Sequence, residues 1–222
     1  MSFTQGRGWS LVWGSNGTET ATSIAVDSDS VYICGSSNSL GSLSVGSFDM
    51  FFLKIDATLG QVQSFLRMGW SGNDIANGIA VQGGNVFIVG QSSSPGWTSS
   101  KTDMVFIRID SSEIHIDWAN SLGGPGDDIA VAVVADSVDL YSIGYGDSGT
   151  LSLGSFDVII TQYSSDGTLK SVMTLGGTSP DYGVDICVFG TTILVTGHSM
   201  SSGLTSGFSD IFVAAIEKSK LT

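Results

Sequence analysis

Val86-Phe-Ile-Val-Gly90 is a run of β-forming residues that ends in glycine, and the chain contains three more runs of this form. They are Val31-Tyr-Ile-Cys-Gly35, Leu140-Tyr-Ser-Ile-Gly144 and Ile193-Leu-Val-Thr-Gly197. The four closing glycines follow one another at steps of 55, 54 and 53 residues. A fixed spacing of this size indicates internal repeats, each of which forms one supersecondary unit.

Two further markers keep the same spacing. An aspartate precedes a second apolar run in each repeat, at Asp49, Asp103, Asp157 and Asp210. A glycine closes a third run, at Gly14, Gly69, Gly123 and Gly176. Because three independent markers stay in phase, we treat residues 1–222 as a single domain with repeats at about 9–62, 63–116, 117–169 and 170–218.

Each repeat has the pattern of four short strands. In the second repeat they cover residues 63–68, 77–81, 85–90 and 103–109, and Gln82-Gly-Gly-Asn85 is a strong hairpin signal. No segment keeps a helical apolar period, so helices should be nearly absent. Four-stranded units of this length are typical of propeller blades. The sequence therefore predicts an all-β, four-bladed β-propeller with four antiparallel strands per blade; a solenoid is the alternative.

The order of the strands bears on how the ring would close. An outer-type run, residues 9–13, precedes every inner strand, and the last repeat stops after its third strand at Ile216. We expect residues 9–14 to complete the fourth blade beside residues 210–217, because a closed ring removes free sheet edges. The other interpretation stays open: the four units form an arc of a larger ring, shared between subunits or cut from a longer chain.

Composition excludes several classes of function. The 222 residues hold 8 basic and 21 acidic side chains, a formal charge of −13, with 41% hydrophobic residues. This balance argues against a nucleic-acid binder and against docking on anionic lipid. No apolar stretch approaches the roughly 18 residues that suggest a membrane span, and residues 1–8 contain no signal peptide pattern. A mature or truncated chain would also lack one, so secretion stays open.

Four acids share one position, two residues before the small residue that opens each inner strand. They are Glu19, Asp74, Asp128 and Asp181. In a closed ring they would form a square of carboxylates at the mouth of the central channel, which could hold a hard cation such as Ca²⁺. The alternative is that each carboxylate accepts backbone N–H groups in its own turn, which would also explain the fourfold repetition. The sequence indicates no other cofactor.

The long loops predict where a ligand binds. They cover residues 36–48, 91–102, 145–156 and 198–209, are rich in Ser and Gly, and should lie on one side of the propeller together with the turns that enter the inner strands. Four residues on this side are candidate contacts: Trp97, Trp70, Tyr145 and His198. An exposed indole on a polar loop suits sugar stacking or a protein hot spot.

The repeat also resembles the bacterial β-propeller repeats called SBBP. The resemblance rests on Ile24-Ala-Val-Asp27, Asp49-Met-Phe-Phe-Leu-Lys-Ile-Asp56 and Leu122-Gly-Gly124, and it covers about residues 9–218. The first two units depart from it, with Gly14-Ser15 and Gly69-Trp70 in place of a glycine pair. The resemblance implies a propeller fold and an extracellular or cell-surface location, and it is uninformative about a reaction.

These patterns support a non-enzymatic binding or interaction module for a protein or glycan. Three alternatives remain: a lectin, a structural or assembly protein, and a metal-dependent enzyme that uses the carboxylate square. The near-equal repeats speak against an enzyme, since catalysis normally singles out one asymmetric spot. The oligomeric state and the identity of the ligand are open at this point.

Overall fold

The structure is a computed structural model that describes residues 8–39, 47–98, 101–203, 205 and 207–221. Residues 40–46, 99–100, 204 and 206 lie outside the described residues. They belong to three of the long loops that the sequence assigns to the ligand-binding side. The described chain is almost wholly β, with the single 3-10 turn η1 (Lys218–Lys220). The all-β prediction is confirmed.

Consecutive strands form four antiparallel meanders, which we call blades 1 to 4. Blade 1 contains β1 (Glu19–Asp27), β2 (Ser30–Ser37), β3 (Asp49–Asp56) and β4 (Val62–Met68). Blade 2 contains β5 (Asp74–Gln82), β6 (Asn85–Ser92), β7 (Asp103–Asp110) and β8 (His115–Leu122). Blade 3 contains β9 (Asp128–Ala135), β10 (Asp139–Gly146), β11 (Asp157–Ser164) and β12 (Leu169–Leu175). Blade 4 contains β13 (Asp181–Phe189), β14 (Thr192–Ser199) and β15 (Asp210–Glu217).

The glycine that ends each defining motif is required by a close backbone approach. The β5–β6 ladder shifts register between Ala76 and Gly78, next to Gly90. A Cβ on Gly90 would lie 2.0 Å from the carbonyl oxygen of Ile75, well inside van der Waals contact. The same 2.0 Å approach recurs at Gly35, Gly144 and Gly197. The repeated glycine therefore permits a bulge that lets the inner strand bend in each blade.

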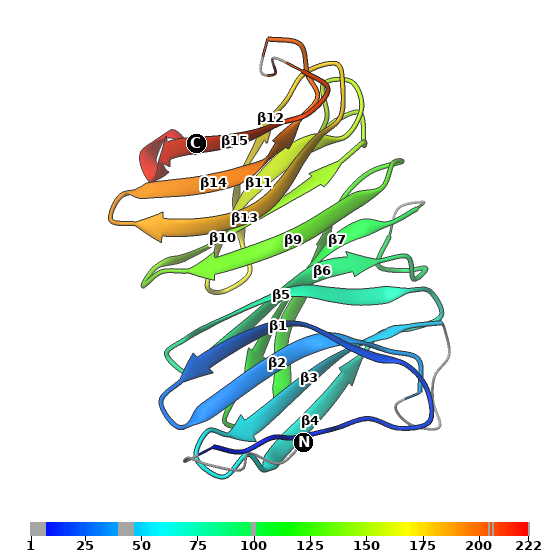
Figure 1. Ribbon diagram of the computed structural model, residues 1–222, viewed down its shortest axis with the longest axis vertical. Coiled ribbons are helices and arrows are strands. Elements are labelled where there is room, and N and C mark those ends of the chain that lie inside the picture. The colour runs from blue at the N-terminus through cyan, green and yellow to red at the C-terminus, as the bar shows by residue number, and fades with distance from the viewer. Residues whose placement is uncertain (1–7, 40–46, 99–100, 204, 206, 222) are drawn as a thin grey trace.

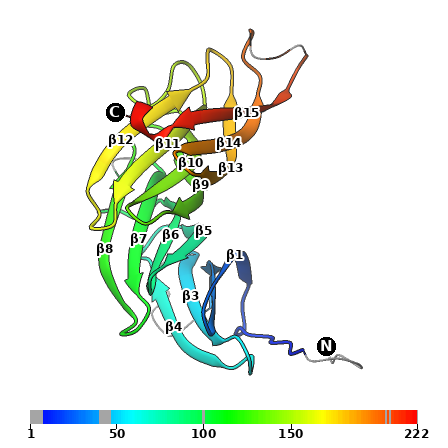
Figure 2. The same cartoon turned by 90° about the vertical axis from the view of Figure 1, so that its left-hand side faces the viewer.

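The blades stack face to face, and each junction has its own core. Blades 1 and 2 enclose one cluster of buried side chains, blades 2 and 3 a second, and blades 3 and 4 a third. The inner strands β1, β5, β9 and β13 lie next to one another along the concave side, and β4, β8 and β12 lie on the convex side (Figures 1 and 2). Stacked four-stranded meanders with the first strand innermost are the arrangement of propeller blades.

The expected closure of the ring within one chain is not what the structure shows. Blades 1 and 4 lie at opposite ends of an open arc (Figures 1 and 2), and β15 pairs with β14 alone among the described strands. Residues 9–14 instead lie against blade 1, where Trp9 Nε1 donates to the carbonyl oxygen of Ala57 at 2.9 Å. Trp13 meets Phe51 with ring centroids 5.4 Å apart. Packing of two indoles on the apolar face of blade 1 thus holds this segment at the far end from blade 4.

Candidate functional site

The four inner-strand acids each serve a turn of their own blade. Asp74 Oδ2 accepts the Trp70 N–H at 2.8 Å and the Ser94 hydroxyl at 2.8 Å. Asp181 Oδ2 accepts the Gly177 N–H at 2.9 Å and the Ser201 hydroxyl at 2.7 Å. Each acid therefore ties the turn before its strand to the long loop of the same blade.

The same arrangement recurs at the other two acids. Asp128 accepts the Gly124 N–H at 3.0 Å and the Ser148 hydroxyl. Glu19 accepts the Ser15 N–H at 3.3 Å and hydroxyls of Ser37 and Ser39. In every blade the loop serine lies 20 residues after the acid, at Ser39, Ser94, Ser148 and Ser201. This regular spacing is readable in the sequence and could have revealed the contact.

The expected square of carboxylates is not formed. Among the described residues, no group of three or more His, Cys, Asp or Glu side chains is placed to hold a metal ion. The physical reason is that hydroxyl and backbone donors of each blade already bind the acid of that blade, in an arc whose ends are apart. The Ser39 hydroxyl, with further bonds from Ser37 and Ser15, lowers the pKa of Glu19 despite some burial.

The second set of acids lies at the junctions between blades. Asp49 is buried, binds the guanidinium of Arg67 (Nε to Oδ2, 2.8 Å), and lies close to Asp74 of the next blade. Asp157 accepts the N–H of Gly177, in the turn that enters blade 4, at 3.1 Å. Burial is the main cause that raises the pKa values of Asp49, Asp128 and Asp157, and the charge of the neighbouring aspartate raises them further. Asp157 therefore connects blade 3 to the turn that enters blade 4.

Two of the four predicted contact residues form one aromatic pair. Trp70 lies in the turn before β5 and Trp97 in the loop after β6, and their rings meet edge to face with centroids 5.0 Å apart. Trp70 is 51% exposed. The sequence predicts an exposed indole on a polar loop at Trp97. In the structure, Trp97 is partly buried and packs against the core between blades 1 and 2. The pair borders an open hollow with Ser71, Pro95 and Gly96.

The other two predicted residues belong to a second aromatic group, at the junction of blades 3 and 4. Tyr145 and His198 both contact Tyr182, with centroid distances of 4.8 Å and 4.9 Å, and the Tyr182 and His198 rings stack. Sequence reasoning missed Tyr182, which supplies the link between them. Burial raises the pKa of the Tyr145 hydroxyl.

This aromatic group borders a hollow of about 540 Å³, much of it lined by the inner strands of the concave side. The remaining lining comes from β5, β6, β9 and β13, as Asn77, Gln91, Ile129, Val131, Gly183 and Val184. The lining thus combines aromatic and aliphatic surface with amide, hydroxyl and imidazole groups, and it contains no carboxylate and no Lys or Arg. We call this surface the concave hollow.

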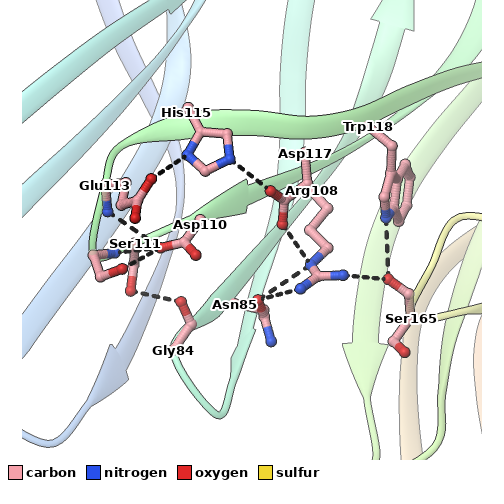
Figure 3. Close-up of polar contacts among 11 residues, drawn as sticks. Gly84, Asn85, Arg108, Asp110, Ser111, Glu113, His115, Asp117, Trp118 and Ser165 are labelled. Carbon is pink, nitrogen blue, oxygen red and sulfur yellow. Dashed lines mark hydrogen bonds and ion pairs between the residues drawn. The ribbon is translucent and has the colours of Figure 1, made fainter.

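Sequence reasoning also missed a polar network at the β5–β6 and β7–β8 turns, at the ends of the strands away from the long loops (Figure 3). Asp117 bridges His115 at 2.8 Å and Arg108 at 3.0 Å. Arg108 Nη1 and Trp118 Nε1 both donate to the carbonyl oxygen of Ser165 in blade 3, each at 3.0 Å. The network therefore fastens blade 2 to blade 3.

No family model matches this chain, and no curated protein matches it. A solved structure of the WD40 domain of Neurospora crassa Pan2 superposes with a TM-score of 0.40 at 9% identity, over 92% of this chain and 64% of that one. The chain thus spans less than two thirds of that domain. The resemblance to SBBP repeats stays an expectation from the repeat motif.

Proposed function

We propose that the protein is a non-enzymatic binding module whose ligand is a glycan held in the concave hollow. The observation that carries the proposal is the composition of that hollow: the rings of Tyr145, Tyr182 and His198 stand beside neutral amides from Asn77 and Gln91. Sugars present apolar C–H faces to aromatic rings and hydroxyls to neutral donors and acceptors. A lining without ionised carboxylate or guanidinium groups suits an uncharged ligand.

The rigidity of the scaffold supports this role. The hollow is built on strands of three consecutive blades, so its side chains are held by backbone ladders and buried cores. A ligand that enters a preformed site loses less free energy to ordering of the protein. The Trp70–Trp97 pair offers a second aromatic contact on the loop side, next to a hollow of its own.

A glycan array with the labelled protein tests the proposal. We expect reproducible binding to a related set of sugars, and at least a tenfold loss of affinity in Tyr182→Ala, in line with the roughly 2 kcal/mol that a central aromatic contact contributes. Phe208→Ala is the matched control, because Phe208 is fully exposed and borders neither hollow. A blank array, or equal binding by Tyr182→Ala, would contradict a glycan site in the concave hollow.

A further inference from the structure

The two ends of the arc expose surfaces that are buried everywhere else in the molecule. On β3, Met50 and Phe52 are 1% and 0% exposed, because blade 2 covers them. The residues at the same repeat positions on β15, Ile211 and Val213, are 86% and 74% exposed. We call the face of blade 4 that contains them, with Val184 and Phe189 on β13, the tail surface.

Blade 1 shows the complementary pattern. Ala76 and Ile79 on β5 are 0% and 7% exposed, because they pack against blade 1. Their equivalents on β1, Ala21 and Ile24, are both exposed, Ile24 at 64%. We call this face, with Val26 and residues 9–14, the head surface. Apolar residues in such number rarely stay uncovered on a soluble protein.

Residues 9–14 occupy the place of an outer strand from a blade that precedes blade 1. Trp9 and Trp118 share one repeat position, and each donates its indole N–H to an equivalent carbonyl, Ala57 or Ser165. Trp118 does this from β8, the outer strand of blade 2, toward the following blade (Figure 3). Trp9 therefore takes the position of an outer-strand residue relative to blade 1, although residues 9–14 belong to none of the sheets of the described chain.

Blade 4 lacks the element that residues 9–14 could supply. Its sheet has three strands among the described residues, whereas the other three sheets have four. The outward edge of β15, the position that β4, β8 and β12 take in the other blades, has no paired strand in the described chain. An unpaired edge of this length is a template for pairing with another chain.

An acid at the tail points to the same missing neighbour. Gly69, Gly123 and Gly176 each lie between the aspartate of their own blade and the acid that begins the next blade. Gly14 has Glu19, the acid that begins blade 1, beside it. The aspartate that would flank Gly14 from a preceding blade has its equivalent in Asp210 of blade 4. Asp210 is half-buried, whereas Asp49, Asp103 and Asp157 are buried. Joining a head to a tail would rebuild this junction.

We propose that the tail surface of one copy receives the head surface of a second copy, and that two copies close a ring. Residues 9–14 of each copy then form the fourth strand of blade 4 in the other. The occupant is a second copy because the head and tail of one chain lie at opposite ends of its arc (Figure 1). Two arcs of four blades make a ring of eight, within the range of four to eight blades that propellers use. Head-to-tail contacts that close generate rings.

Light scattering during size-exclusion chromatography tests the proposal. The wild-type chain should have twice the monomer mass of 23.0 kDa. Val213→Asp on the tail and Ile24→Asp on the head should each reduce the mass to that of one copy. Both side chains are exposed in the single arc, so the circular dichroism spectrum should be unchanged. Val138→Asp is the control, because Val138 is 62% exposed but lies outside both surfaces, and it should keep the doubled mass.

Mixing the two variants separates head-to-tail contact from other modes. Val213→Asp retains an intact head and Ile24→Asp an intact tail, so their mixture should regain the doubled mass through one junction. A wild-type chain of 23.0 kDa at the highest soluble concentration would overturn the proposal. So would variants that keep the doubled mass, a mixture that stays at the mass of one copy, or polymers in place of a closed pair.

Discussion

At the scale of single residues, the repeated glycine is a position where any side chain would collide with the backbone. Gly90→Ala would place a methyl group 2.0 Å from the Ile75 carbonyl, a backbone atom that cannot move without breaking the ladder. We expect a loss of about 3 kcal/mol in the free energy of unfolding, at the upper end for overpacking. Urea denaturation measures it. Gly149→Ala is the control, because nothing lies within 4 Å of its Cβ position; equal stability of the two variants would refute the steric argument.

The two cysteines should differ strongly in reactivity. Cys34 is completely buried, and burial raises the pKa of its thiol to about 11, whereas Cys187 is exposed. The experiment uses Val213→Asp, the variant expected to stay a single copy. A thiol reagent should label the exposed Cys187 at once and Cys34 only after unfolding, because the thiolate is the nucleophile and burial disfavours it at Cys34. Two fast thiols in the folded protein would contradict the burial of Cys34.

The same thiol gives a pH dependence at the alkaline end. In the folded protein the Cys34 thiol has a pKa of about 11, whereas the pKa of an unfolded cysteine is near 9.0. The contribution of this residue is therefore complete below pH 9 and is lost as the pH rises toward 11. The Cys34→Ser variant measures how much of the alkaline loss of stability comes from this thiol. The free energy of unfolding of the variant should fall less between pH 9 and 11 than that of the wild type.

At the scale of elements, the sequence predicts the strands well because each carries its own information. The apolar runs and the Gly and Asp markers lie within one repeat, and the Gln82–Asn85 turn connects β5 and β6 as expected. The aromatic groups were only half predicted. Tyr145 and Tyr182 come from different blades, and their contact depends on how β10 and β13 pack, which no local pattern encodes.

Three buried aspartates predict an unusual acid response. The pKa values of Asp49, Asp128 and Asp157 are raised above 3.8, so the folded protein binds protons before the unfolded chain does. Their contribution is complete below pH 3.8 and is lost as the pH rises through the folded pKa values. Stability should therefore increase as the pH falls from neutrality through the folded pKa values of these aspartates toward 3.8, as thermal unfolding can show. Asp128→Asn, which retains the shape of the side chain, should show a smaller increase.

More strongly acidic conditions act in the opposite direction. Serine and backbone hydrogen bonds lower the pKa of Asp110 to about 2, and hydrogen bonds lower the pKa values of Glu19 and Asp166 as well. These groups stabilise the fold above their unfolded pKa values, and that contribution is lost as the pH falls toward 2. A stability that falls steadily from pH 7 downward would contradict the raised pKa values of Asp49, Asp128 and Asp157.

At the scale of the whole molecule, the curvature of the arc is the property that the sequence does not determine. The periodicity gives four units, but the rotation from one blade to the next depends on how side chains such as Met50 and Phe52 fit against Ala76 and Ile79. The expectation of a ring closed by residues 9–14 within one chain was wrong for that reason. The outer-type character of these residues is nevertheless reflected in the structure, since Trp9 makes the contact that Trp118 makes.

Charge makes a separate prediction about the pairing of copies. Each chain carries a formal charge of −13, so two copies repel one another, while the head and tail surfaces are mainly apolar. Added salt screens the repulsion and should tighten the association. Sedimentation equilibrium at two salt concentrations measures this effect. A dissociation constant that rises with salt would indicate an interface held by ion pairs, contrary to the apolar contact described here.

Small-angle X-ray scattering of the intact chain tests the two-copy ring most directly, because it measures mass and shape together. We predict twice 23.0 kDa from the forward scattering and a pair-distance distribution typical of a ring with a central opening. A compact particle of 23.0 kDa, with both ends of one chain joined in a four-bladed ring, would contradict the account.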